Sequence, residues 1–212
     1  TTKEILNLSL PTVSGRLIGN IGFFFEPIIL TNILLAIGYS NHFILTEYGA
    51  YNAYSISLLA MPSFFVQAIS SSLLPEISKF YSQKNMSMVK RRYKQAFILS
   101  FIVGVFFSTI IYIFRDNLLQ ALYNTTNGSN YIAILAPFFV LFYLEGPMQS
   151  VLQAIGKAKT CMFITLIAIL IKLLSMTVLS FLHIGMYSLV IAEIIDIFIV
   201  VLLCIKTINK AI

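Results

Sequence analysis

Charged residues are scarce in this chain. Asp, Glu, Lys and Arg make up 10% of its 212 residues, whereas 58% of the residues are hydrophobic. A soluble domain carries a far larger charged share, so this composition excludes one. A membrane β-barrel would show short alternating segments, but the chain has long apolar runs such as residues 97–114. We therefore predict an all-α integral membrane protein.

Residues that commonly bind metals or catalyse reactions, such as cysteine and histidine, are rare as well. The two cysteines, Cys161 and Cys204, and the two histidines, His42 and His183, are far apart in the sequence. A metal site needs several such ligands at short spacing, and no nucleophile–base pair is apparent within the apolar runs. We expect no metal, no cofactor, no disulfide and no enzymatic activity.

The hydrophobic pattern divides into six segments, each long enough to cross a bilayer at about 20 apolar residues per helix. The predicted spans are residues 5–37, 48–75, 95–114, 130–152, 160–182 and 186–206. We expect residues 1–212 to form one six-helix bundle. The first segment lacks a cationic leader and a cleavage site, so it is not a signal peptide. Because the chain begins with Thr1, we expect a piece of a longer protein.

The net charge of +6 by itself would admit a nucleic-acid partner, but the placement of the cations argues against one. Of the 14 Lys and Arg residues, all but Arg16, Arg115 and Lys172 lie at alternate ends of the spans. These are Lys3, Lys79, Lys84, Lys90, Arg91, Arg92, Lys94, Lys157, Lys159, Lys206 and Lys210. The asymmetry follows the positive-inside rule and predicts that both termini are cytoplasmic.

Ionisable residues lie deep inside three of the predicted spans: Arg16 and Glu26 in the first, Lys172 in the fifth, and Glu193 and Asp196 in the sixth. Such groups are costly at membrane depth, and they usually line a water-filled path or a substrate site. They are therefore the leading candidates for function.

The first span combines a packing face with a polar face. Small or acidic residues share one side of it at helical spacing: Gly15, Gly19, Gly22 and Glu26. Glycines there permit close helix contact, while Arg16 and Asn20 form an adjacent polar stripe. Pro27 removes a backbone hydrogen bond and predicts a kink beside Glu26.

The second span carries polar residues on one side of a helix: Tyr48, Asn52, Ser55, Ser63, Gln67 and Ser70. The stripe is explained either by hydrogen bonds between helices or by one wall of a hydrated cavity. On the second interpretation, Asn52 and Gln67 are cavity residues together with Arg16, Asn20 and Glu26.

The last two spans form a tight hairpin in which Lys172 and Asp196 lie at nearly equal depth. One interpretation is a structural ion pair that permits both groups to be buried. The other is a cluster that titrates and couples to H⁺ or Na⁺, because one cation cannot neutralise both Glu193 and Asp196.

Three stretches, residues 9–40, 58–85 and 145–160, resemble one known family. The most specific features are the spacing of Arg16, Glu26-Pro27 and Gly38-Tyr39-Ser40, then residues 74–78 (LPEIS) and 152–157 (LQAIGK). They are similar to the second half of the polysaccharide-transport and stage V sporulation protein B group. That group belongs to the multidrug/oligosaccharidyl-lipid/polysaccharide (MOP) flippase superfamily. The resemblance implies a six-helix C-terminal lobe of a MATE/MOP-type transporter, without its N-terminal lobe.

The resemblance also implies a function. Members flip lipid-linked sugars, such as lipid II or undecaprenyl-diphosphate oligosaccharides, across the bacterial cytoplasmic membrane by alternating access. The products serve cell-wall, spore-cortex or surface polysaccharide synthesis. The expected partners are membrane lipids, the polyprenyl-diphosphate-linked glycan and the missing N-terminal lobe. Arg16 would bind the phosphate groups, and Pro27, Gly146 and Pro147 would act as hinge residues, that is, as flexible points.

Two alternatives remain. A drug/cation antiporter of the same superfamily would use Glu193 and Asp196 to bind Na⁺ or H⁺ and cationic compounds. A membrane assembly protein without transport would have fully paired buried charges and no cavity.

Overall fold

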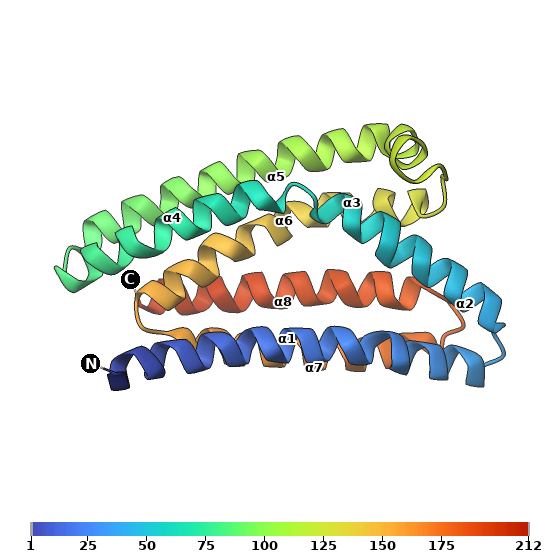
Figure 1. Ribbon diagram of the computed structural model, residues 1–212, viewed down its shortest axis with the longest axis horizontal. Coiled ribbons are helices and arrows are strands. Elements are labelled where there is room, and N and C mark those ends of the chain that lie inside the picture. The colour runs from blue at the N-terminus through green and yellow to red at the C-terminus, as the bar shows by residue number, and fades with distance from the viewer. Residues whose placement is uncertain (1, 212) are drawn as a thin grey trace.

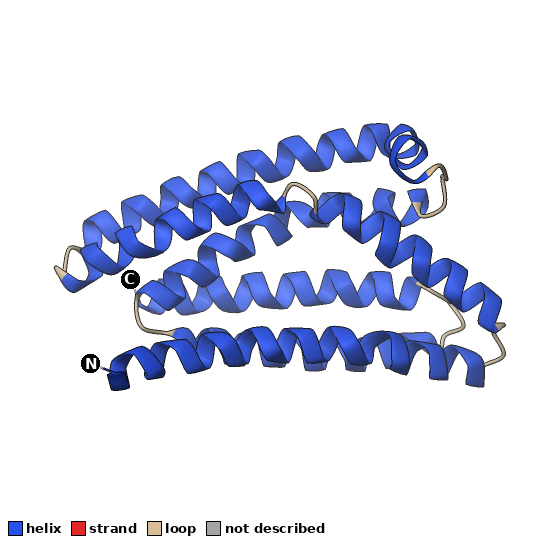
Figure 2. Cartoon of the chain, viewed as in Figure 1, coloured by secondary structure: helices blue, strands red, loops and turns tan. Residues whose placement is uncertain are grey.

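The structure is a computed structural model that describes the backbone of residues 2–211, and side chains from residue 13 onward except those of residues 15, 16, 18 and 19. All regular structure in this range is helical, and the helices are joined by short loops (Figure 2). The elements are α1 (Thr2–Ala36), α2 (Asn41–Tyr48), the π-helix η1 (Gly49–Ile56), α3 (Ser57–Ala60), α4 (Ser63–Ser82), α5 (Met86–Tyr123), α6 (Ser129–Ala154), α7 (Ala158–Ser180) and α8 (Tyr187–Ala211). The predicted all-α architecture is confirmed.

The chain passes back and forth along the long axis of the bundle (Figure 1). The stretch from α2 to α4 makes one return pass, and α5, α6, α7 and α8 then alternate in direction, so that α1 begins and α8 ends at the same end. Helix α1 packs on α7, α7 on α8, α8 on α6, and α6 on both α4 and α5. Helix α6 therefore joins the two sides of the lobe.

Within the described residues, helices α5, α6, α7 and α8 are long and apolar enough to cross a membrane, and the bent pair Asn41–Ala60 and Ser63–Ser82 would add a fifth crossing. In α1 only the stretch Asn20–Ala36 registers as an apolar helix. Because the side chains of the first third of α1 lie outside the described part, the count of six spans stays a prediction.

The second predicted span is broken at Met61 and Pro62, where the two helical parts meet at 51°. Pro62 has no backbone N–H to continue the ladder, and the π-helix η1 lies one turn upstream. At membrane depth the freed carbonyls need other partners. One of them is supplied from α6, because the Tyr143 hydroxyl donates to the carbonyl of Leu59.

The prolines that the sequence singled out as flexible points do not interrupt their helices. Helix α1 continues through Pro27 to Ala36, and α6 continues through Gly146 and Pro147. The interruption lies instead in the second span, where the sequence predicted a continuous helix. Proline inside a helix costs one hydrogen bond, which packing against a neighbouring helix can offset. The role of these residues as hinges stays a prediction.

The core follows α6, which contributes to both hydrophobic clusters of the lobe. Phe139 and Tyr143 pack with Tyr51 in one cluster, and Met148 and Leu152 pack in the other. Large apolar side chains are exposed on the outer helices, among them Phe24, Phe101, Ile113, Leu174 and Val178. A helix that is apolar all round, with an exposed apolar outer face, is typical of a membrane span.

Helices α1 and α7 approach closely at Gly22. A Cβ atom at this position would lie 2.5 Å from Cγ2 of Ile169 in α7, which is closer than atoms in contact can come. The close-packing face predicted for the first span is therefore confirmed at Gly22, while Gly15 and Gly19 lie outside the described residues. Ile169 is β-branched and has one strongly preferred χ1 rotamer in a helix, so a rotation that moves Cγ2 away is unfavourable.

We expect Gly22→Ala to destabilise the protein and Gly49→Ala to leave its stability unchanged or slightly raised. Overpacking of this kind costs about 1–3 kcal/mol, whereas a Cβ at Gly49 meets nothing within 4 Å. Thermal unfolding of the full-length protein in detergent measures both variants. An unchanged midpoint for Gly22→Ala would contradict the close approach.

Candidate functional site

Lys172 of α7 lies between two carboxylates from neighbouring helices. Its Nζ is 2.6 Å from Oε2 of Glu26 in α1 and 2.6 Å from Oε2 of Glu193 in α8. The three side chains are 15%, 4% and 14% exposed, respectively. Such distances are those of charge-assisted hydrogen bonds, so one ammonium binds both acids inside the lobe.

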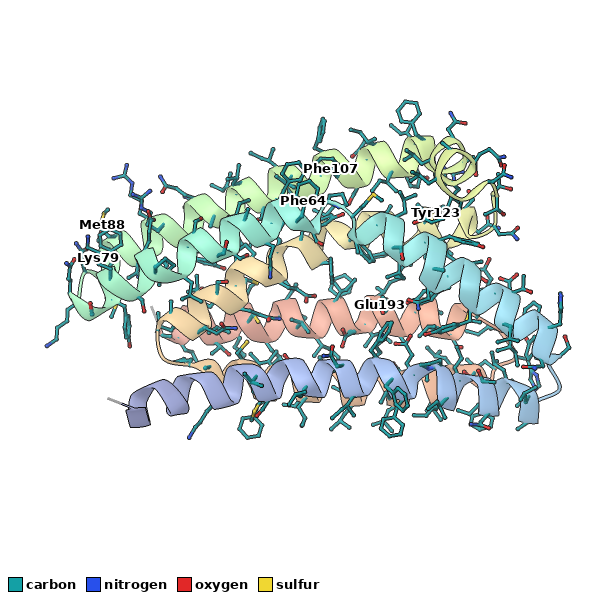
Figure 3. The ribbon with its side chains drawn as sticks, in the orientation of Figure 1. Phe64, Lys79, Met88, Phe107, Tyr123 and Glu193 are labelled. Atoms are coloured by element: carbon teal, nitrogen blue, oxygen red, sulfur yellow. The ribbon has the colours of Figure 1, made fainter. Side chains whose placement is uncertain are left out.

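A fourth element completes this cluster. The hydroxyl of Tyr51, in the π-helix η1, donates to Glu193 Oε2 over 3.2 Å. Glu193 lies in the first third of α8, and Figure 3 shows it away from either end of the bundle. The charge cluster, defined here as Glu26, Tyr51, Lys172 and Glu193, therefore joins α1, η1, α7 and α8 at depth.

The partners of Lys172 differ from those that the sequence predicted. Asp196 is the partner that the sequence predicts, because it lies at nearly the same depth in the hairpin. The structure instead pairs Lys172 with Glu26 and Glu193. Depth gives only the position along a helix. At about 100° per residue, residues three apart point about 60° apart, and the flexible Lys side chain reaches the acid one turn nearer the hairpin.

Two further acids lie beside the cluster. Glu145 of α6 and Asp196 of α8 line a hollow of about 220 Å³ that is also lined by Glu26 and Lys172. Among the described residues, Oε1 of Glu145 and Oδ1 of Asp196 are buried without a hydrogen-bond partner. One lysine therefore faces four carboxyl groups, of which it contacts two. Glu145 is not among the candidate residues that the sequence indicates, although it is an acid inside the predicted span 130–152.

A larger hollow of about 660 Å³ lies between α4 and α6, at the break in the second span. Figure 3 shows Phe64 just after this break, at the start of α4. The lining includes Met61, Ser63, Phe64, Gln67, Ser71, Phe142, Tyr143, Glu145, Gly146 and Gln149. Glu145 and Gln149 line the smaller hollow as well, so the two hollows adjoin at α6.

The remaining candidate residues are spread over the lobe. Gln67 lines the larger hollow, Asn52 is half-buried in η1, and Asn20 is exposed on α1. The side chain of Arg16 lies outside the described residues. The structure thus brings Glu26, Lys172, Glu193 and Asp196 together, whereas Asn20 and Asn52 line neither of the two hollows.

The polar stripe of the second span serves two purposes. The hydroxyl of Ser55 lies within hydrogen-bond distance of two acceptors, the carbonyls of Ala50 and Gly128, and the hydroxyl of Ser70 donates to the carbonyl of Val66. These buried hydroxyls are satisfied by backbone, whereas Gln67 faces the hollow. Both interpretations of the stripe therefore apply, to different residues.

We expect Lys172→Met to destabilise the protein strongly, because it leaves two buried carboxylates without a cation. Breaking a buried pair in this way costs about 3–5 kcal/mol. Adding Glu26→Gln and Glu193→Gln to Lys172→Met should restore most of the lost thermal stability in detergent, whereas adding Asp196→Asn should restore little. Better rescue by Asp196→Asn would show that Glu26 and Glu193 are not the partners of Lys172.

Comparison with known proteins identifies the family. The family model described as MatE matches residues 27–179. Stage V sporulation protein B from Bacillus subtilis (strain 168) is 36% identical over 172 residues, which cover 81% of this chain and 33% of that protein. The chain therefore spans about a third of the length of this relative.

Solved structures agree in fold. A MOP superfamily transporter from Pyrococcus furiosus matches with a TM-score of 0.78 at 14% identity, over 95% of this chain and 43% of that one. An outward-facing multidrug resistance MATE family transporter of the same superfamily matches with a TM-score of 0.78 at 12% identity, over 95% and 44%. The chain belongs to the MatE family, and its fold corresponds to somewhat less than half of a MOP superfamily transporter.

Proposed function

We propose that this chain is one lobe of a flippase that moves lipid-linked sugars across the bacterial cytoplasmic membrane by alternating access. The observation that carries the proposal is the hollow at the broken second span. It is partly polar, it lies within a lobe whose outer surface is apolar, and its volume of about 660 Å³ falls in the range of sites for small ligands.

A helix break at membrane depth supports a transport site. Irregular backbone is tolerated there only where it is buried in protein or lines a water-filled cavity. In transporters built from two lobes, interrupted helices commonly mark the substrate site near the bilayer midplane. The break at Met61 and Pro62 meets this condition, because Met61 and Ser63 line the hollow.

The substrate class rests on the relatives and on Arg16. The identity to Stage V sporulation protein B is 36%, against 12% to the drug transporter. The resemblance of residues 9–40, 58–85 and 145–160 to that group implies polyprenyl-diphosphate-linked sugars, for cell-wall, spore-cortex or surface polysaccharide. A guanidinium keeps its charge at any physiological pH and binds phosphate with two parallel hydrogen bonds, so Arg16 is the proposed phosphate ligand of this lobe.

The charge cluster is proposed to keep the lobe rigid during transport. It ties α1 to α7 and α8 at depth, so that these helices would move as one body against the N-terminal lobe, which is not part of this chain. The proposed orientation has both ends of the chain in the cytoplasm. Its support is that the cations gather at one end of the bundle. Figure 3 shows Lys79 at this end and Tyr123 toward the opposite end.

A drug/cation antiporter is the second candidate. It is favoured by the surplus of acids beside Lys172, because Glu145 and Asp196 each keep a buried oxygen without a partner in the described part of the lobe. A protein with no transport role would be expected to pair its buried charges and to lack a cavity. The two hollows count against that assignment.

We expect Arg16→Ala in the full-length protein to reduce translocation of a fluorescent undecaprenyl-diphosphate sugar in proteoliposomes to background, with expression unchanged. The control is Arg91→Ala, since Arg91 is exposed near the start of α5 and should not matter. Translocation by Arg16→Ala at the wild-type rate would remove Arg16 from the site. A wild-type protein that moves a cationic dye and no lipid would support the antiporter instead.

A further inference from the structure

We propose that the hollow between α4 and α6 binds the sugar of the lipid-linked substrate and excludes its diphosphate. The inference rests on the proposed function and specifies which part of the substrate this lobe receives. It is carried by the kinds of polar group in the hollow, by its aromatic side chains and by the charges next to it.

The polar groups of the hollow are suited to hydroxyls. Gln67 from α4 and Gln149 from α6 both line it, and each amide offers donors as well as an acceptor. Sugar hydroxyls also donate and accept, so amides match them in either direction. Glu145 adds a buried Oε1 that has no partner among the described residues and can accept from a hydroxyl.

The apolar groups are suited to the other face of a sugar ring. Phe64 is 62% exposed at the edge of the hollow, and Phe142 contributes a second ring. The C–H face of a pyranose is apolar and can lie against an aromatic ring. Aromatic surface combined with a few convergent polar groups is the usual composition of a small-molecule site.

The charges next to the hollow disfavour an anion. Its lining contains one carboxyl group, Glu145, and within the described residues it contains no Lys or Arg. The adjoining smaller hollow adds Glu26 and Asp196. Lys172, the one cation among the described residues that line it, already contacts two carboxylates at 2.6 Å. Like charges in a low-dielectric site repel strongly, so the diphosphate must bind a cation elsewhere, on Arg16 or on the other lobe.

The test measures binding of two lipids to the purified full-length protein in nanodiscs. One probe is undecaprenyl diphosphate bearing a single N-acetylhexosamine, and the other is undecaprenyl diphosphate without a sugar. We expect Gln67→Leu/Gln149→Leu to weaken binding of the sugar-bearing lipid at least tenfold and to leave binding of the bare diphosphate unchanged.

Gln153→Leu is the matched control, because Gln153 follows Gln149 by one turn of α6 and does not line the hollow. It should change neither affinity. Phe64→Ala is the second variant, since an exposed ring is removed at little cost to folding. It should weaken only the sugar-bearing lipid, even where the double variant folds poorly.

The outcomes separate the two proposals. Binding of neither lipid by the wild-type protein would defeat the proposed function. Equal binding of the two lipids by the wild-type protein would overturn this inference and leave the proposed function standing. The same holds if the variants weaken binding of both lipids to the same extent, or weaken binding of neither.

Discussion

The contact on which the lobe depends is that of the Lys172 ammonium with two carboxylates. In hydrocarbon each of these charges alone would be costly, and burial is tolerated because Glu26 and Glu193 both lie 2.6 Å from Nζ. The arrangement matters most for α1, which packs chiefly on α7. Gly22 lets the two backbones approach, and the ion pair to Glu26 fixes the same face one turn later.

This contact also divides the polar interior of the lobe. Because Lys172 is engaged on both sides, it contributes no free positive charge to the larger hollow, which keeps amides, hydroxyls, aromatic rings and one acid. A substrate that carries both a sugar and a diphosphate would then meet a largely uncharged surface in the larger hollow and an acidic one beside it. The neutral part finds partners at α4 and α6, and the anionic part is directed away from Glu145 and Asp196.

The helices and the family of the lobe could be predicted from the sequence, because long apolar runs and the residues around Glu26-Pro27 are strong local signals. The partners of Lys172 could not. They depend on the rotation of α8 and on the place of α1 beside α7, and neither follows from depth along a hairpin. The break at Met61 and Pro62 could not be predicted either, for a different reason. Pro27 was the more conspicuous proline, and the π-helix before Pro62 leaves no pattern in the residues.

The π-helix has a consequence for how the second span aims its side chains. A π-helix closes its hydrogen bonds one residue later than an α-helix does, so each of its turns takes up more of the chain. Rewinding Gly49–Ile56 as an ordinary α-helix would rotate α3 about the shared axis, and α4, which leaves that axis at 51°, would change direction. The contact of Tyr51 with Glu193 and the place of Gln67 in the larger hollow both depend on this winding. The winding of one membrane helix therefore bears on both the charge cluster and the larger hollow.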